Sequence, residues 1–247
     1  ITRNTEKMAR QLSRNLNLGS FKIFTAKQPE LFNASYDNQP EDWSMKAGLT
    51  WLGDLQLEII QPVEGKSVYD DYLNDRNQRP GIEHVFFSTE NYDQTKNNFH
   101  KLGYALKQEA QLNAAGRLGI IPIPALPSFL SHLAAKFGYT STIETLKIDI
   151  EIAKFPKGVS QRIALKAAIA EKWIPASIPI LFESPPDDTP FEEVDTLFIL
   201  CQDLKTTVSH FAKLTDRAPT IEEFDPSVLP GTGSIAKISV GKKLLVL

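Results

Sequence analysis

The residues of this sequence most able to do chemistry are an acid and an imidazole set in apolar surroundings. Glu58 lies within the aliphatic run LQLEII, and His84 directly precedes the apolar run VFF. A buried carboxylate or imidazole is costly unless it is paired or bound to a metal ion. One such residue alone is more often structural than functional. Here two such residues lie on predicted strands, which are joined by the helix-like segment SVYDDYL and a turn at residues 79–81. We therefore weigh the hypothesis that they form one shared site against the structural interpretation.

The front of the chain predicts a helix followed by three strands. Apolar residues recur at helical spacing over residues 4–18. The polar residues 28–42 are interpreted as a loop. Strand-like alternation covers residues 21–24, 46–52 and 55–60.

A second unit with a similar order of predicted elements starts at His84. Its predicted elements are a strand, a helix and two strands over residues 84–88, 92–102, 104–109 and 116–121. Within residues 122–145, the apolar spacing predicts a short extra helix that includes Phe137. Residues 145–155 alternate as a strand, with Glu151 on its polar face. The pattern leaves open whether that face meets solvent or a cupped site.

The rear of the chain repeats these elements. Placing Thr196 on His84 aligns residues 196–214 with residues 84–102 without a gap, and placing Gly241 on Gly53 aligns a strand, a glycine turn and a strand. Repetition at this scale is a strong architectural signal. On the second alignment the first helix would follow a strand that lies before the chain, which also starts without methionine, so we interpret the chain as a fragment.

The segment between the two repeats has a different composition. Residues 159–190 contain a helix-like stretch and then a cluster of prolines and aspartates, which indicates a linker. We therefore predict a front domain over residues 1–158 and a rear domain over residues 191–247.

Composition narrows the function classes. The chain has 247 residues, 42% hydrophobic and 23% charged, which is typical of globular proteins. The net charge is −3 and the basic residues are spread out, so the sequence predicts binding to neither nucleic acid nor a membrane. The single cysteine, Cys201, excludes an internal disulfide, and we expect a cytoplasmic location. Phosphate loops, CxxC pairs, GxSxG elbows and HExxH helices are absent from the sequence.

The central segments resemble one superfamily. The order LEIIQP, a short helix, GIEHVFF and a helix ending in KLGY is similar to the centre of a vicinal oxygen chelate domain, and is most similar to methylmalonyl-CoA epimerase-like modules. This resemblance implies an α+β fold in which paired βαβββ modules form a cupped, mixed, mostly antiparallel sheet around a divalent metal ion. Residues 1–158 would be two such modules without their first strand, and residues 191–247 a partial second domain.

The resemblance also implies a set of metal ligands, on the first and last strand of each module. Carried over by position, these are Glu58, His84 and Glu151, with a fourth on the strand that would precede the chain. We expect the three side chains to converge, with Glu151 also the candidate catalytic residue. Carboxylates and imidazole suit divalent Mn, Co, Ni, Zn or Fe. The rear positions, Thr196 and Val246, offer no useful ligand, so we expect no metal site there.

Three functions remain open at this stage. The first is a glyoxalase-like or epimerase-like lyase or isomerase that acts on a small substrate with adjacent oxygens through a metal-stabilised enolate. With iron and dioxygen, the same site would suit an extradiol-type dioxygenase. The third is a non-catalytic small-molecule binding protein of the bleomycin-resistance type. One departure from the epimerase-like pattern is that its HH dipeptide is Glu83-His84 here. The other histidines, His100, His132 and His210, are interpreted as surface or capping residues.

Overall fold

The structure is a computed structural model of the chain. It describes residues 1–16, 18, 21–52, 55–113, 134–156, 196–198, 203–215, 220–223, 234–240 and 243–246. The predicted strand at residues 116–121, most of the predicted helix within residues 122–145 and the predicted linker at residues 159–190 lie outside these ranges. None of the described helices is long and apolar enough to cross a membrane.

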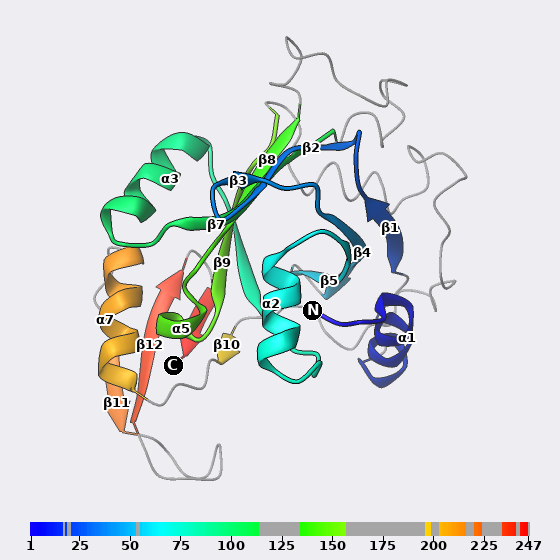
Figure 1. Cartoon of the computed structure of the whole chain (residues 1–247). Coiled ribbons are helices and arrows are strands. Elements are labelled where there is room, and N and C mark those ends of the chain that lie inside the picture. Colours follow the sequence, from blue (N-terminus) through cyan, green and yellow to red (C-terminus); the bar gives the residue numbers. More distant parts are fainter. Residues whose placement is uncertain are drawn as a thin grey trace.

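The first module is a helix on a small antiparallel sheet. Its elements are α1 (Thr5–Leu16), β1 (Lys22–Ala26), β4 (Ser44–Leu52) and β5 (Leu55–Glu64). The strands are hydrogen-bonded in the order β1-β4-β5. Helix α1 buries Ala9 against Ile23 and Ile59 of the sheet, with Met8 and Leu12 packed around them. The predicted amphipathic helix and the strands that follow it are therefore confirmed (Figure 1).

The second module is a complete βαβββ unit. Its elements are β6 (His84–Ser88), α3 (Tyr92–Lys101), β7 (Leu106–Leu112), β8 (Ala135–Thr140) and β9 (Asp149–Lys154). Strand β6 pairs in parallel with β9, and the remaining neighbours are antiparallel. This mixed, mostly antiparallel α+β arrangement confirms the predicted fold class.

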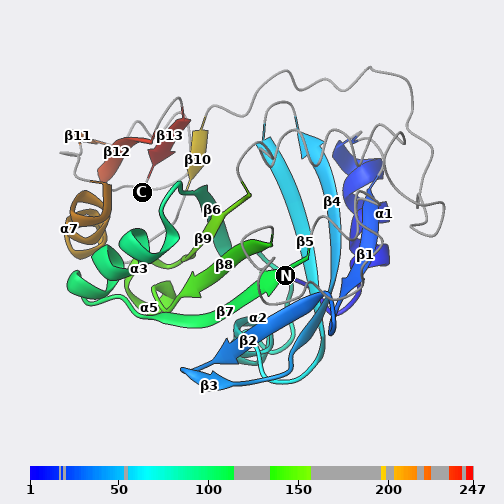
Figure 2. The ribbon, with the colours of Figure 1, turned by 90° about the horizontal axis from the view of Figure 1, so that it is seen from above.

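A hairpin from the first module extends the sheet of the second. Strands β2 (Leu31–Tyr36) and β3 (Gln39–Pro40) lie between β1 and β4 in sequence, but β2 pairs with β7. The result is a six-stranded sheet of order β3-β2-β7-β8-β9-β6. Figure 2 shows this sheet curving round to face β4 and β5, with the hairpin passing below. The sheets thus form the two walls of a cup.

An aromatic core fills part of the cup. Helix α2 (Val68–Asp75) starts at Ser67, whose hydroxyl accepts a hydrogen bond from the Asp70 amide. The helix inserts Tyr69 between the sheets, where its ring makes edge contacts with Trp43 and Tyr139. Side chains from both sheets join this core, including Ile60 of β5 and Ala153 of β9. The two sheets are therefore held together by this packing as well as by the β2–β3 hairpin.

The rear elements repeat the order of the second module. They are β10 (Thr196–Phe198), α7 (Leu204–Thr215), β11 (Thr220–Glu223), β12 (Ser234–Val240) and β13 (Lys243–Val246). The strand order β10-β13-β12-β11 matches β6-β9-β8-β7, and β10 again runs parallel to β13. Phe198 pairs with Val246 as Phe86 pairs with Glu151, so the alignment of Thr196 on His84 is kept in this parallel pair. Helix α7 packs Val208 and Phe211 against isoleucines on and just before β9 of the second module, in one core cluster.

Three local expectations were wrong. Residues 28–42, predicted as a loop, contain the β2–β3 hairpin, whose two-residue turn places Asp37 and Asn38 at positive φ. Phe137, predicted on a helix, lies in β8, where it pairs with Ala110 and Ala153. The strand predicted for residues 145–155 starts only at β9, because residues just before it form the short helix α5 (Ile143–Leu146).

Candidate metal centre

Three strands position the three residues predicted as ligands. Glu58 lies on β5, His84 starts β6 and Glu151 lies on β9. On β5, Leu57 and Ile59 pack towards α1, and side chains alternate along a strand, so Glu58 faces the other way, into the cup.

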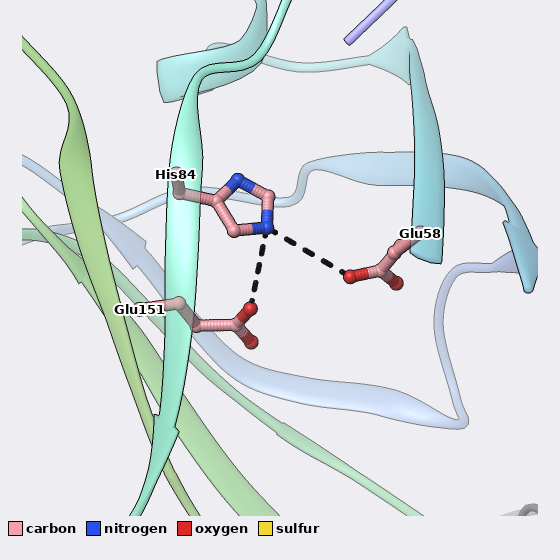
Figure 3. Close-up of side chains that lie close together, drawn as sticks. All are labelled: Glu58, His84 and Glu151. Carbon is pink, nitrogen blue, oxygen red and sulfur yellow. Dashed lines mark ion pairs between the residues drawn. The ribbon is translucent and has the colours of Figure 1, made fainter. Parts of the chain in front are cut away.

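The same alternation settles the direction of Glu151. Its neighbours Ile150 and Ile152 pack on the outer side, in the cluster that includes α7. Glu151 therefore points into the cup, together with His84, whose strand it pairs with (Figure 3). The sequence pattern had left this direction open between solvent and the cup.

The three side chains converge as expected. The His84 Nε2 atom lies 3.4 Å from Glu151 Oε2 and 3.9 Å from Glu58 Oε2 (Figure 3). One ligand atom from each residue lies within 4.8 Å of the others. Among the residues that the structure describes, this is the one group of three or more His, Cys, Asp or Glu side chains so arranged.

This donor set fits a divalent metal ion. Ligand atoms sit about 2.1 Å from such an ion, so two ligands of one ion lie at most about 4.2 Å apart. Both separations measured from His84 Nε2 meet this limit, and the Glu58 and Glu151 oxygens, within 4.8 Å of each other, lie close to it. Two carboxylates and one imidazole form an N,O set that leaves further coordination positions open.

The two most buried groups of the centre have strongly shifted proton affinities. Burial lowers the pKa of His84, but the Glu58 and Glu83 carboxylates raise it, and the net result lies well above its usual value. Burial raises the pKa of Glu151 to about 8, although the neighbouring His84 opposes the shift. Without a cation between them, these residues therefore hold protons at neutral pH.

A second layer of acids lies behind His84. The Glu83 Oε2 atom is 2.6 Å from His84 Nδ1, and Glu83 is buried. Asp149, paired with His84 across β6 and β9, accepts hydrogen bonds from the amides of Thr142 and Ile143. Burial, and then Glu83, raise the pKa of Asp149 to about 8.

Sequence reasoning missed this layer. Glu83 was noticed only as a departure from a histidine pair, and Asp149 was not singled out. Their signal was present, because an acid next to a candidate ligand and an acid two residues before another candidate are natural positions for groups that orient ligands.

An aromatic wall closes one side of the centre. The Tyr139 ring makes an edge contact with the His84 ring at 5.1 Å between centroids, and hydrogen bonding from Tyr139 favours the charged form of Glu151. Tyr69 is fully buried, and its hydroxyl has no hydrogen-bond partner among the described residues. Two buried tyrosines therefore lie beside the ligand residues on this side of the centre.

The remaining histidines lie elsewhere. His210 of α7 contacts the hydroxyl of Tyr104 through its Nδ1 atom, and His100 lies in the last turn of α3. Neither belongs to the metal-site group. His132 lies outside the described residues.

We expect the metal-free protein to lose stability as pH rises from about 5 to 8. His84, Glu151 and Asp149 all have folded-state pKa values raised above their ordinary values. The folded state therefore binds protons more tightly than the unfolded state, and this stabilisation disappears as pH rises through the folded pKa values. One fully titrating group contributes at most about 1.4 kcal/mol per pH unit, or roughly 3–5 °C of melting temperature in a chain of this size.

Thermal unfolding at several pH values, after treatment with a chelator, measures this effect. A divalent ion takes deprotonated ligands, so its addition should raise the melting temperature most at the alkaline end. A melting temperature that rises with pH in the chelator-treated protein would contradict the raised pKa values.

The fold of this chain is similar to that of solved protein structures. No protein-family model matches the sequence, and no curated protein matches it in sequence. A mutant of 4-hydroxymandelate synthase from Streptomyces coelicolor is similar in structure over all of this chain, at 12% identity and a TM-score of 0.53. The chain spans 59% of the length of that synthase. A methylmalonyl-CoA epimerase structure aligns with 63% of this chain and 90% of its own, at 11% identity and a TM-score of 0.36.

Proposed function

Because the chain has the fold of the vicinal oxygen chelate superfamily, we propose that it is a metal-dependent enzyme acting on a small substrate with two adjacent oxygens. Within that class we propose a lyase or isomerase of the glyoxalase or epimerase type. The observation that carries the proposal is the convergence of Glu58, His84 and Glu151 inside the cup, with ligand atoms within 4.8 Å of one another.

The proposed roles follow from the chemistry of each side chain. Glu58 Oε2, His84 Nε2 and Glu151 Oε2 would hold a divalent ion between the two walls of the cup. When bound, such an ion acts as a Lewis acid that stabilises negative charge on neighbouring substrate oxygens. The protein residues would then position the substrate and move its proton.

Glu151 is the group best placed to move a proton. Its Oε2 atom faces His84, and its second oxygen lies on the side away from the imidazole (Figure 3). Glu151 is buried on β9 and faces the cup, and a buried carboxylate with one oxygen directed away from the imidazole suits a group that both takes and returns a proton. We propose that this carboxylate accepts a proton from the carbon next to a substrate carbonyl.

The aromatic wall would support the same reaction. Tyr69 and Tyr139 are buried beside the acids, and burial raises the pKa of both hydroxyls well above their usual value. They therefore stay protonated as hydrogen-bond donors. The unpartnered Tyr69 hydroxyl is available to donate to a substrate oxygen.

Binding of oxalate tests the demand for two adjacent oxygens. Oxalate presents two neighbouring oxygens, whereas acetate presents a single carboxylate. We expect protein loaded with Mn²⁺ to bind oxalate at least about 10-fold more tightly than acetate, and chelator-treated protein to bind neither, because only a bidentate ligand can fill two open positions. Calorimetric titration measures both affinities.

The alternatives give different results in the same titrations. A protein that takes up no divalent ion, yet binds apolar small molecules, would be a binding protein of the bleomycin-resistance type. Equal affinities for oxalate and acetate would show that the ion does not offer two adjacent positions, and would remove adjacent oxygens as the substrate class.

A further inference from the structure

Glu83, the buried acid next to His84, has been given no function so far. Glu83 is 2% exposed, and its Oε2 atom lies 2.6 Å from His84 Nδ1. Its other carboxylate oxygen is buried without a hydrogen-bond partner among the described residues. Placing a carboxylate in this position is costly, so its contact with the imidazole needs an explanation.

The contact decides which nitrogen of His84 faces the acids of the centre. The Glu83 carboxylate, where it is ionised, only accepts hydrogen bonds, and Nδ1 then carries the hydrogen that Glu83 receives. The other nitrogen, Nε2, is the atom that lies 3.4 Å from Glu151 and 3.9 Å from Glu58. A neutral imidazole with hydrogen on Nδ1 has its free lone pair on Nε2, where an ion would bind.

The backbone keeps Glu83 in place. Its carbonyl oxygen accepts a hydrogen bond from the Asp149 amide at 2.7 Å, at the point where β6 and β9 start to pair. His84 itself is packed edge-on against Tyr139. The imidazole is therefore held by a carboxylate at one nitrogen and by an aromatic ring at its side, which leaves one orientation open to it.

We infer that Glu83 is a positioning residue that fixes the orientation and tautomer of His84, so that Nε2 is presented to the divalent ion. This inference rests on the proposed metal site. A carboxylate that receives the second N–H of a ligating histidine typically improves metal affinity by about 10–100-fold. Glu83 acts through His84 and does not itself touch the ion.

Two substitutions of Glu83 separate the effect of its hydrogen-bond acceptor from the effect of its charge. Glu83→Ala removes the acceptor, so we expect zinc affinity to fall about 10-fold or more. Glu83→Gln keeps a carbonyl acceptor but loses the charge, and charge-assisted hydrogen bonds are roughly twice as strong as neutral ones, so we expect a smaller loss of about 3-fold. Glu90→Ala changes an exposed glutamate just beyond β6 and should leave zinc affinity unchanged.

The readouts are zinc affinity, from competition with a chromogenic chelator, and the ring ¹⁵N shifts of His84 in zinc-loaded protein, assigned with His84→Gln. Wild type and Glu83→Gln should show hydrogen on Nδ1 and zinc on Nε2, and Glu83→Ala a mixture of the two arrangements. Unchanged affinity and ¹⁵N shifts in Glu83→Ala would overturn this inference alone. If Glu83→Ala does not fold, unchanged zinc affinity in Glu83→Gln overturns it. A wild-type protein that binds no zinc, manganese or cobalt would overturn the metal site itself.

Discussion

Replacing His84 with alanine is expected to weaken binding of a divalent ion by about 100-fold or more. Residues that only orient ligands already contribute roughly 10–100-fold, and His84 would supply the nitrogen ligand itself. Its Nε2 atom lies between the Glu58 and Glu151 carboxylates, so its loss would also leave two acids facing each other without an imidazole. Metal content after dialysis, and affinity by chelator competition, measure the change.

The repeat in the chain supplies a matched control for this substitution. Thr196 starts β10 as His84 starts β6, in the same register against its parallel neighbour. Thr196→Ala therefore changes the same position of the same strand in another module and should leave metal content at the wild-type level. Equal metal content in wild type and in both variants would rule out His84 as a ligand.

Replacing Glu151 with glutamine is expected to slow proton exchange in a bound hydroxyketone by about 100-fold or more, as removal of a general base typically does. Hydroxyacetone has a hydroxyl and a carbonyl oxygen on adjacent carbons. In heavy water its methylene protons should exchange with deuterium in the presence of the metal-loaded protein, because Glu151 would take a proton from carbon and return a deuteron. Proton NMR follows the loss of the methylene signal.

Glu58→Gln separates proton transfer from metal binding. Both substitutions replace a predicted carboxylate ligand by a neutral amide, so both should weaken metal binding. At saturating metal, however, only Glu151→Gln should remain slow, because the proposed base is the Glu151 oxygen that faces away from His84. Equal exchange rates in the two variants under these conditions would assign Glu151 a role as ligand alone.

Much of the fold could be predicted because its elements carry local signals. Helix α1 shows clear helical spacing, and the repeat of β6 and α3 in β10 and α7 can be read in sequence. The β2–β3 hairpin was missed because its strands are short and polar and are stabilised by pairing with β7, far along the chain. Helix α5 was missed because the apolar alternation continues through its residues. Its start depends instead on a contact across the chain, in which the Thr142 amide donates a hydrogen bond to the Asp149 carboxylate.

The candidate site could be predicted only in part. The resemblance gave positions for Glu58, His84 and Glu151, and the structure brings their side chains together. The direction of Glu151 depended on which face of β9 is covered from outside, and α7, distant in sequence, contributes to that cover. Glu83 was not assigned a role because the sequence shows an acid beside His84 but does not show whether the two side chains meet, which they do at 2.6 Å in the structure.

The path of the β2–β3 hairpin has a consequence for how the two walls are held when an ion binds. The chain leaves the wall that carries Glu58, crosses to pair with the wall that carries His84 and Glu151, and then returns. The spacing between the carboxylate on one wall and the imidazole on the other is thus set by continuous backbone as well as by packed side chains. An incoming ion would meet ligand atoms that the backbone already holds within 4.8 Å of one another, so binding would demand small side-chain movements and the release of protons, and little movement of the two walls.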